Sequence, residues 1–146
     1  MTQVPASLTD FARRLLLHEA GDRRSARDLV DAMERGSLSL HSQLAPLLSS
    51  TGFDALVGRA VKLAARDFPF LAAVTTPRSG SLDGLRQAAE PREPQEVEGA
   101  LVAILATFIW LLIIFIGENL GLRKVREVWP DVPFTLPGSS STKAQP

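Results

Sequence analysis

Residues 99–117 form an uninterrupted apolar segment, GALVAILATFIWLLIIFIG, which carries no charged side chain and a single hydroxyl group, on Thr107. Twelve of its side chains are Leu, Ile, Val or Phe. The segment has about the length that an α-helix needs to cross the hydrocarbon core of a bilayer. A helix without a polar stripe must be hidden from water on all sides, by lipid or by the rest of the protein.

Hydropathy favours the lipid environment. At about −0.3 to −0.6 kcal/mol for each strongly apolar side chain, insertion into a bilayer gains at most roughly 4–7 kcal/mol. Glu118 follows the segment directly, where it would mark the headgroup boundary of a membrane-spanning helix. The segment therefore predicts a protein that is held in or at a membrane.

Other features favour a buried helix at the centre of a soluble bundle. Trp110 lies near the middle of the segment, whereas membrane tryptophans prefer the two interfaces. The flank after the segment is basic and the flank before it is acidic, so the positive-inside tendency would place the C-terminal tail in the cytoplasm. That topology requires export of the roughly 98-residue segment that precedes the helix, which is charged and predicted to form several helices, and the N-terminus does not resemble a secretory signal. A third hypothesis combines both environments, with a central helix that a soluble bundle can release into a bilayer.

The rest of the chain predicts amphipathic helices and no convincing strand, because apolar residues recur at helical spacing in four segments. Ser25 and Asp28 form a capping-box pattern at the start of one helix, and Gly36 is expected to end it. Pro46 is expected to break the next helix near Ala45. The first three segments lie at residues 8–20, 26–35 and 40–48, and the fourth is opened by Thr51 and Asp54 and closed by Pro69 near Asp67 or Phe68.

The chain is expected to be an all-α protein, a small bundle of amphipathic helices around or preceding one long apolar C-terminal helix. Residues 1–74 form the amphipathic helical region, and residues 75–96 are rich in Pro, Gly, Ser and charge, which predicts a linker with one weak helical turn. Residues 97–129 are expected to form the long helix, and residues 130–146 a disordered tail.

The sequence offers no pattern typical of catalysis or of metal and cofactor binding. The chain has no cysteine, and His18 and His41 lack metal-ligand spacing. A glycine-rich phosphate loop, an H-E-x-x-H motif and a nucleophile elbow are all missing. We therefore expect neither an enzyme nor a protein with a cofactor, a metal or a small-molecule substrate.

The charge distribution gives no sign of nucleic-acid binding. The formal net charge is zero, so no long-range field attracts a polyanion. The densest basic cluster, Arg23, Arg24 and Arg27, has acidic neighbours and no interleaved aromatic residue for base stacking.

The C-terminal stretch FIGENLGLRKVREVWPD resembles the closing motif of a family of small uncharacterised bacterial helical proteins. In that family a helix that ends in Phe-Ile-Gly-Glu leads through a leucine- and arginine-containing turn into Trp-Pro. The motif residues here are Gly117, Glu118, Arg123, Trp129 and Pro130. The segment LAPLLSSTGFDALVGRAVKLAARDFPFL is similar to the middle of that family, with matches at Pro46, Gly52, Phe53, Arg59, Ala60 and Phe70.

The resemblance covers about residues 8–131 and implies an all-helical unit without an assigned activity. Members of the family look soluble, and this chain departs from them with Trp110, Ile113 and Ile114, where smaller or more polar residues are usual. The resemblance places the protein in a bacterium, where the apolar helix predicts association with the inner membrane. A cytoplasmic location is the alternative.

The favoured hypothesis is a non-catalytic helical interaction protein, associated with a membrane through residues 99–117 and presenting its N-terminal helices to a protein partner of unknown identity. The alternative is a soluble bundle with the same helix as its core, acting as an adaptor or a self-associating regulator. The side chains expected to face lipid or core are Leu101, Ile104, Leu105, Phe108, Trp110, Leu112, Ile113, Phe115 and Ile116.

Overall fold

The computed structural model describes residues 4–77 and 81–133 of the chain. These residues form five α-helices and one 3₁₀ helix: α1 (Ala6–Ala20), α2 (Ala26–Ala64), η1 (Pro69–Ala73), α3 (Leu85–Ala89), α4 (Pro94–Ile116) and α5 (Glu118–Val128). An isolated antiparallel bridge joins Thr75 to Asp83, and the described residues contain no strand. The prediction of an all-α bundle is confirmed.

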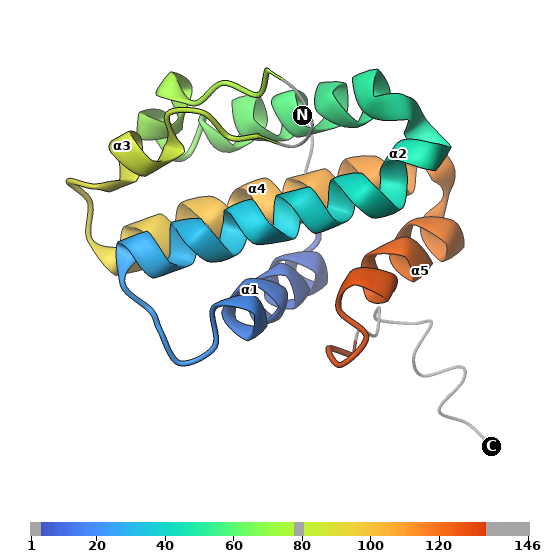
Figure 1. Ribbon diagram of the computed structural model, residues 1–146, viewed down its shortest axis with the longest axis horizontal. Coiled ribbons are helices and arrows are strands. Elements are labelled where there is room, and N and C mark those ends of the chain that lie inside the picture. Colours follow the sequence, from blue (N-terminus) through green and yellow to red (C-terminus); the bar gives the residue numbers. More distant parts are fainter. Residues whose placement is uncertain (1–3, 78–80, 134–146) are drawn as a thin grey trace.

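The apolar segment lies in α4, which packs against α1, α2 and α5. Figure 1 shows α2 bending back on itself, so that its first arm (residues 26–48) and its second arm (residues 50–64) run in opposite directions beside α4. In this view the second arm lies above α4 and α1 lies below it. Phe53 of the second arm meets Phe108 of α4 edge to face, with 5.4 Å between the ring centroids. The core of the protein therefore forms around α4.

The start of α2 is as predicted, but its predicted end at Gly36 is wrong. The Ser25 hydroxyl accepts the Asp28 backbone N–H, and the Asp28 carboxylate accepts the Ser25 N–H, which completes the capping box. The helix then continues through Gly36, where the absence of a side chain makes room for Trp129 instead of ending the helix. A Cβ at this position would lie 3.0 Å from the Trp129 ring, so glycine permits close approach of the indole.

The predicted break near Ala45 is also wrong. The helix passes through Pro46, and the break comes three residues later at Ser49, with φ 67° and ψ 161°. Leu44 is fully buried in the turn before the proline, so packing holds this turn helical. The Ser49 hydroxyl accepts the Gly52 N–H at 3.0 Å, which caps the second arm and offsets part of the backbone strain at this bend.

The single helix expected over residues 97–129 is divided at Gly117, with φ 95° and ψ 156°, a conformation open essentially to glycine alone. The expected linker, 75–96, contains α3. Of the expected tail, residues 134–146 lie outside the described part of the chain, and Val132 is buried.

A pair of arginine substitutions near the end of α4 tests whether this helix is the core of the bundle. Leu112 is fully buried, whereas Ile114 is 62% exposed. Leu112→Arg places an unpaired charge in the core and should lower the free energy of unfolding by more than about 3 kcal/mol. Ile114→Arg should change it by less than about 0.5 kcal/mol. Urea unfolding followed by circular dichroism measures both, and equal effects of the two substitutions would contradict this arrangement.

Candidate interaction surface

The exposure of α4 changes along its length. Most side chains from Val97 to Leu112 are buried, and exposure begins at the C-terminal end. Of the side chains predicted to face lipid or core, Phe115 is exposed, and Trp110, Ile113 and Ile116 are partly buried. The fully or almost fully buried members of that set are Leu101, Ile104, Leu105, Phe108 and Leu112.

Among the described residues, α4 is the one helix that is long and apolar enough to cross a membrane. Its 23 residues contain an 18-residue window with a mean hydropathy of 2.8, and 56% of that window is buried inside the protein. The core helix of a soluble protein meets the same criterion of length and composition.

Large apolar side chains reach solvent where α2 bends and α4 ends. Ile114 is 62% exposed and Phe115 is 66% exposed, and Leu47 next to the bend is 45% exposed. Figure 1 places the bend of α2 and the end of α4 at the same end of the molecule. We call this region, residues 46–52 and 113–117, the uncharged end.

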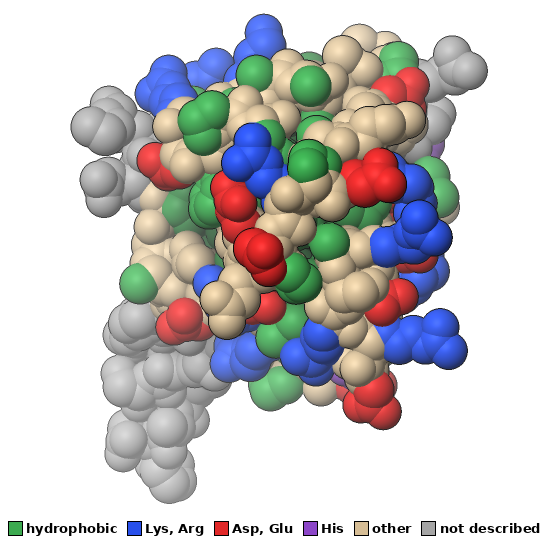
Figure 2. Space-filling view, turned by 90° about the vertical axis from the view of Figure 1, so that its left-hand side faces the viewer, with side chains coloured by type: hydrophobic (Ala, Val, Ile, Leu, Met, Phe, Trp, Pro, Cys, Tyr) green, Lys and Arg blue, Asp and Glu red, His purple; other side chains and the backbone are tan. Residues whose placement is uncertain are grey.

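The uncharged end is where two charge-free stretches of the sequence meet. The chain contains no Asp, Glu, Lys or Arg from residue 36 to 53 or from residue 99 to 117. Exposed polar groups at the bend are hydroxyls, on Ser49, Ser50 and Thr51. The opposite end, viewed directly in Figure 2, carries basic and acidic side chains interspersed among apolar side chains and other atoms. The lack of charge over residues 36–53 is the sequence signal that could have indicated this surface.

The residues of the C-terminal motif have separate positions. Glu118 and Arg123 are exposed on α5, and Pro130 is exposed after it. Trp129 is buried, and its indole N–H donates to the Glu19 carboxylate at 2.9 Å. The motif therefore contains one buried anchor and several surface positions.

Three elements meet at Trp129. Glu19, at the end of α1, is held by Arg35 of α2, whose guanidinium donates to the Glu19 carboxylate at 2.9 Å and to its backbone carbonyl at 2.8 Å. The indole lies over Gly36, also of α2. A residual cavity of about 10 Å³ adjoins the ring, so the indole is closely packed. The Trp129 contact thus joins α1, α2 and the end of α5.

Charged side chains elsewhere form exposed surface networks. Arg86 of α3 donates to Asp31 at 2.7 Å and to Glu34 at 2.8 Å, and these two carboxylates raise the pKa of Arg86 above its usual value. The hydrogen bond from the Ser25 hydroxyl lowers the pKa of Asp28. Both groups stay charged at neutral pH, which is typical of structural ion pairs and caps and not of acid–base catalysis.

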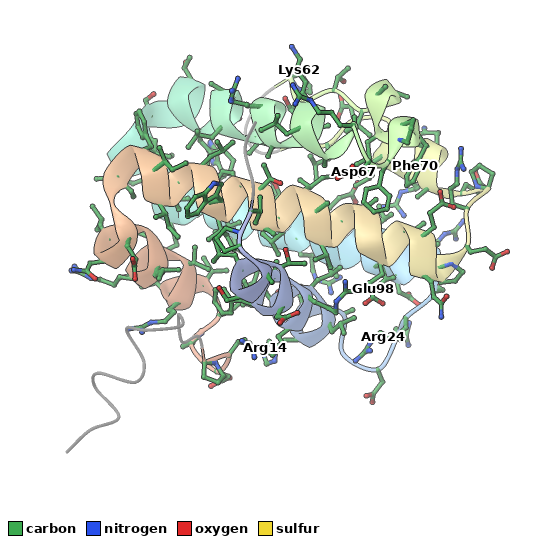
Figure 3. The ribbon with its side chains drawn as sticks, turned by 180° about the vertical axis from the view of Figure 1, so that it is seen from behind. Arg14, Arg24, Lys62, Asp67, Phe70 and Glu98 are labelled. Atoms are coloured by element: carbon green, nitrogen blue, oxygen red, sulfur yellow. The ribbon has the colours of Figure 1, made fainter. Side chains whose placement is uncertain are left out.

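A groove of about 530 Å³ runs along the face of α4 that Figure 3 shows, between α1 and the second arm of α2. Its floor includes the small residues Gly99 and Ala103, and its lining contains neither histidine nor cysteine. Arg13 at its rim forms an ion pair with Glu98. The hydroxyl and carboxylate groups of this lining are those of Thr9, Thr107 and Asp67.

The two histidines belong to different helices, His18 to α1 and His41 to α2. His18 is exposed near the end of α1, whereas the His41 ring lies 3.1 Å from the Ser50 hydroxyl and edge to face with Phe53. The described residues contain no group of three or more His, Cys, Asp or Glu side chains that could hold a metal ion.

Comparison with known proteins adds no relationship, since no family model, no curated protein and no solved structure matches this chain. The resemblance of its C-terminal motif to a bacterial family therefore stays a prediction.

The Trp129 contact gives a direct test of how the C-terminal segment is held. Trp129→Phe keeps a ring over Gly36 but removes the N–H that Glu19 accepts, and should lower the free energy of unfolding by about 1–3 kcal/mol. Trp110→Phe is the matched control, because Trp110 is partly exposed, and should cost less than about 1 kcal/mol. Guanidinium chloride unfolding measures both, and an equal loss in the two variants would show that the indole N–H contributes nothing.

Proposed function

We propose that this protein is a non-catalytic helical interaction protein that acts as a folded bundle and docks its uncharged end on the surface of a lipid bilayer. The observation that carries the proposal is the exposure of Ile114 and Phe115 at the end of an otherwise buried apolar helix. These side chains gain free energy when they leave water, and a bilayer interface can receive them without any change in the fold.

The size of the exposed apolar surface favours lipid over a second protein chain. A stable protein–protein interface buries about 800 Å² on each partner. A large side chain contributes about 150–250 Å² when it is completely buried. Leu47, Ile114 and Phe115 are already partly covered, so together they offer much less than such an interface needs.

The same side chains set the strength of the contact. Full burial of a Leu, Ile or Phe side chain is worth about 1.5–3 kcal/mol, so insertion of the exposed fractions of these three is worth roughly 3–5 kcal/mol. That is less than the transfer of a myristoyl chain, which itself gives reversible binding. The proposed contact is therefore weak and reversible.

The charge of the uncharged end determines whether the protein is expected to prefer anionic or neutral lipid headgroups. The uncharged end contains no basic side chain, and the protein has a formal net charge of zero. Anionic headgroups therefore gain little electrostatic attraction, and salt should have little effect. In this orientation the charged opposite end, which includes α3, faces the aqueous side, where it can meet a protein partner.

Insertion of the whole of α4 across the membrane is a second candidate, favoured by its 23-residue length and its mean hydropathy of 2.8. It requires α1, α2 and α5 to leave the faces of α4 that they cover. Sodium carbonate extraction distinguishes the two, because a spanning helix stays in the membrane pellet and a surface contact is released.

Vesicle flotation of the intact protein tests the proposed surface contact. We expect the protein to float with phosphatidylcholine vesicles, with little change between low and high salt. The double variant Ile114→Ser and Phe115→Ser should reduce the vesicle-bound fraction at least about tenfold, since it removes most of the inserted apolar surface.

Leu38→Ser is the matched control, because Leu38 is another exposed apolar side chain, 56% exposed, on the first arm of α2 away from the bend. It should float like the unaltered protein. Failure of the unaltered protein to float would contradict the proposal. So would a concentration-dependent dimer without lipid that the Ile114/Phe115 double variant abolishes, since it would indicate that a second copy covers this surface.

A further inference from the structure

α5 and the turn that follows it are attached to the bundle by a single face. The buried residues after Gly117 are Gly121, Val125, Trp129 and Val132, at intervals of four, four and three. The remaining side chains of α5 are exposed or partly exposed. The outermost polar contact is long, 3.4 Å from the Arg14 guanidinium to the Pro133 carbonyl. This one face packs against α4 and α2, and it is the contact that has to break for the segment to leave the bundle.

The start of α5 is suited to act as a hinge. Gly117 has a positive φ of 95°, and no atom from elsewhere in the protein lies within 4 Å of the position where a Cβ would be. Its backbone can change conformation without displacing a neighbour, and glycine has the widest choice of conformations. The far end of the segment is fastened by Trp129, whose N–H donates to Glu19.

The segment covers apolar surface that adjoins the uncharged end. Gly121 lies against Ile113, since a Cβ at residue 121 would be 3.5 Å from the Ile113 Cγ1 atom. Trp129 lines a small cavity together with Leu16, Met33 and Leu105, which come from three different helices. Release of the segment would extend the exposed apolar area from Ile114 and Phe115 back along α4.

We propose that residues 118–133 form a lid, hinged at Gly117 and latched by the contact of Trp129 with Glu19, which opens while the rest of the bundle stays folded. Opening enlarges the apolar surface available to lipid, so the lid regulates the membrane contact and to this extent rests on the proposed function. The closed lid limits that contact to the exposed side chains of the uncharged end.

Opening of the lid alone is consistent with how the bundle is packed. The N-terminal two-thirds of α4 is covered by α1 and both arms of α2, which need not move when α5 leaves. Elements with few buried contacts open locally at a lower free energy than the whole fold. An 11-residue helix is too short to be stable without packing, so the open lid is expected to lose its helical structure.

Hydrogen exchange of the full chain, without lipid, tests the lid directly. Backbone amides from Gly121 to Trp129 should exchange at least about tenfold faster, after correction for intrinsic rates, than amides from Leu101 to Ile109. Trp129→Phe should accelerate exchange of the lid about threefold or more. The Leu101–Ile109 amides should accelerate only by the factor that corresponds to the loss in free energy of unfolding, so that the lid still exchanges at least about tenfold faster than they do. Trp110→Phe is the control and should leave the protection of the lid unchanged relative to that of α4.

Equal protection of the lid and α4 would overturn the lid, because it would show that α5 opens only with the whole bundle. Unchanged exchange of the lid in Trp129→Phe would overturn the role of Trp129 as its latch. A second arm adds phosphatidylcholine vesicles, which should accelerate exchange of the lid further by favouring its open state. Vesicles that bind the protein without changing lid exchange would overturn its regulatory role. Absence of binding in the flotation experiment would contradict the proposed function, while the lipid-free exchange would still decide whether the lid opens.

Discussion

No face of α4 can be left in water without cost, and the other helices are arranged by the need to cover it. α1, both arms of α2 and α5 each present apolar residues to it and charged residues to solvent. The coverage ends at Ile114 and Phe115, and this boundary defines the surface where an interaction is proposed. The same apolar helix thus provides both the core of the fold and the surface through which the protein is proposed to act.

The sequence predicted the helical class because apolar spacing and the Ser25–Asp28 cap are local signals that the structure uses directly. The sequence was less informative about where helices end at glycine and proline, because the effect of these residues on a helix depends on tertiary contacts. Gly36 resembles a helix stop but lies under an indole, and Pro46 resembles a break but lies in a turn held by packing. At Gly117 the chain does change direction, and there a glycine within an apolar run is compatible with either continuation or a bend.

The candidate surface was only partly predictable for a related reason. The side chains of α4 could be identified as apolar, but which of them the bundle covers depends on where α2 bends. That bend is set by a serine with positive φ, which no propensity favours. It brings residues 46–52 to the end of α4, more than sixty residues away along the chain. The spacing of apolar residues within one helix does not indicate that residues 46–52 and the end of α4 lie side by side.

The close approach of Gly36 and Trp129 has a consequence for the substitutions that this chain can accept. Because a Cβ at residue 36 would fall within 3.0 Å of the indole, the side-chain volumes at these two positions are linked. Alanine at residue 36 should be tolerated better beside a smaller ring than beside tryptophan, so the effects of the two changes should not add. A pair separated by more than ninety residues thereby behaves, under mutation, as one steric unit that spans the first long helix and the C-terminal turn.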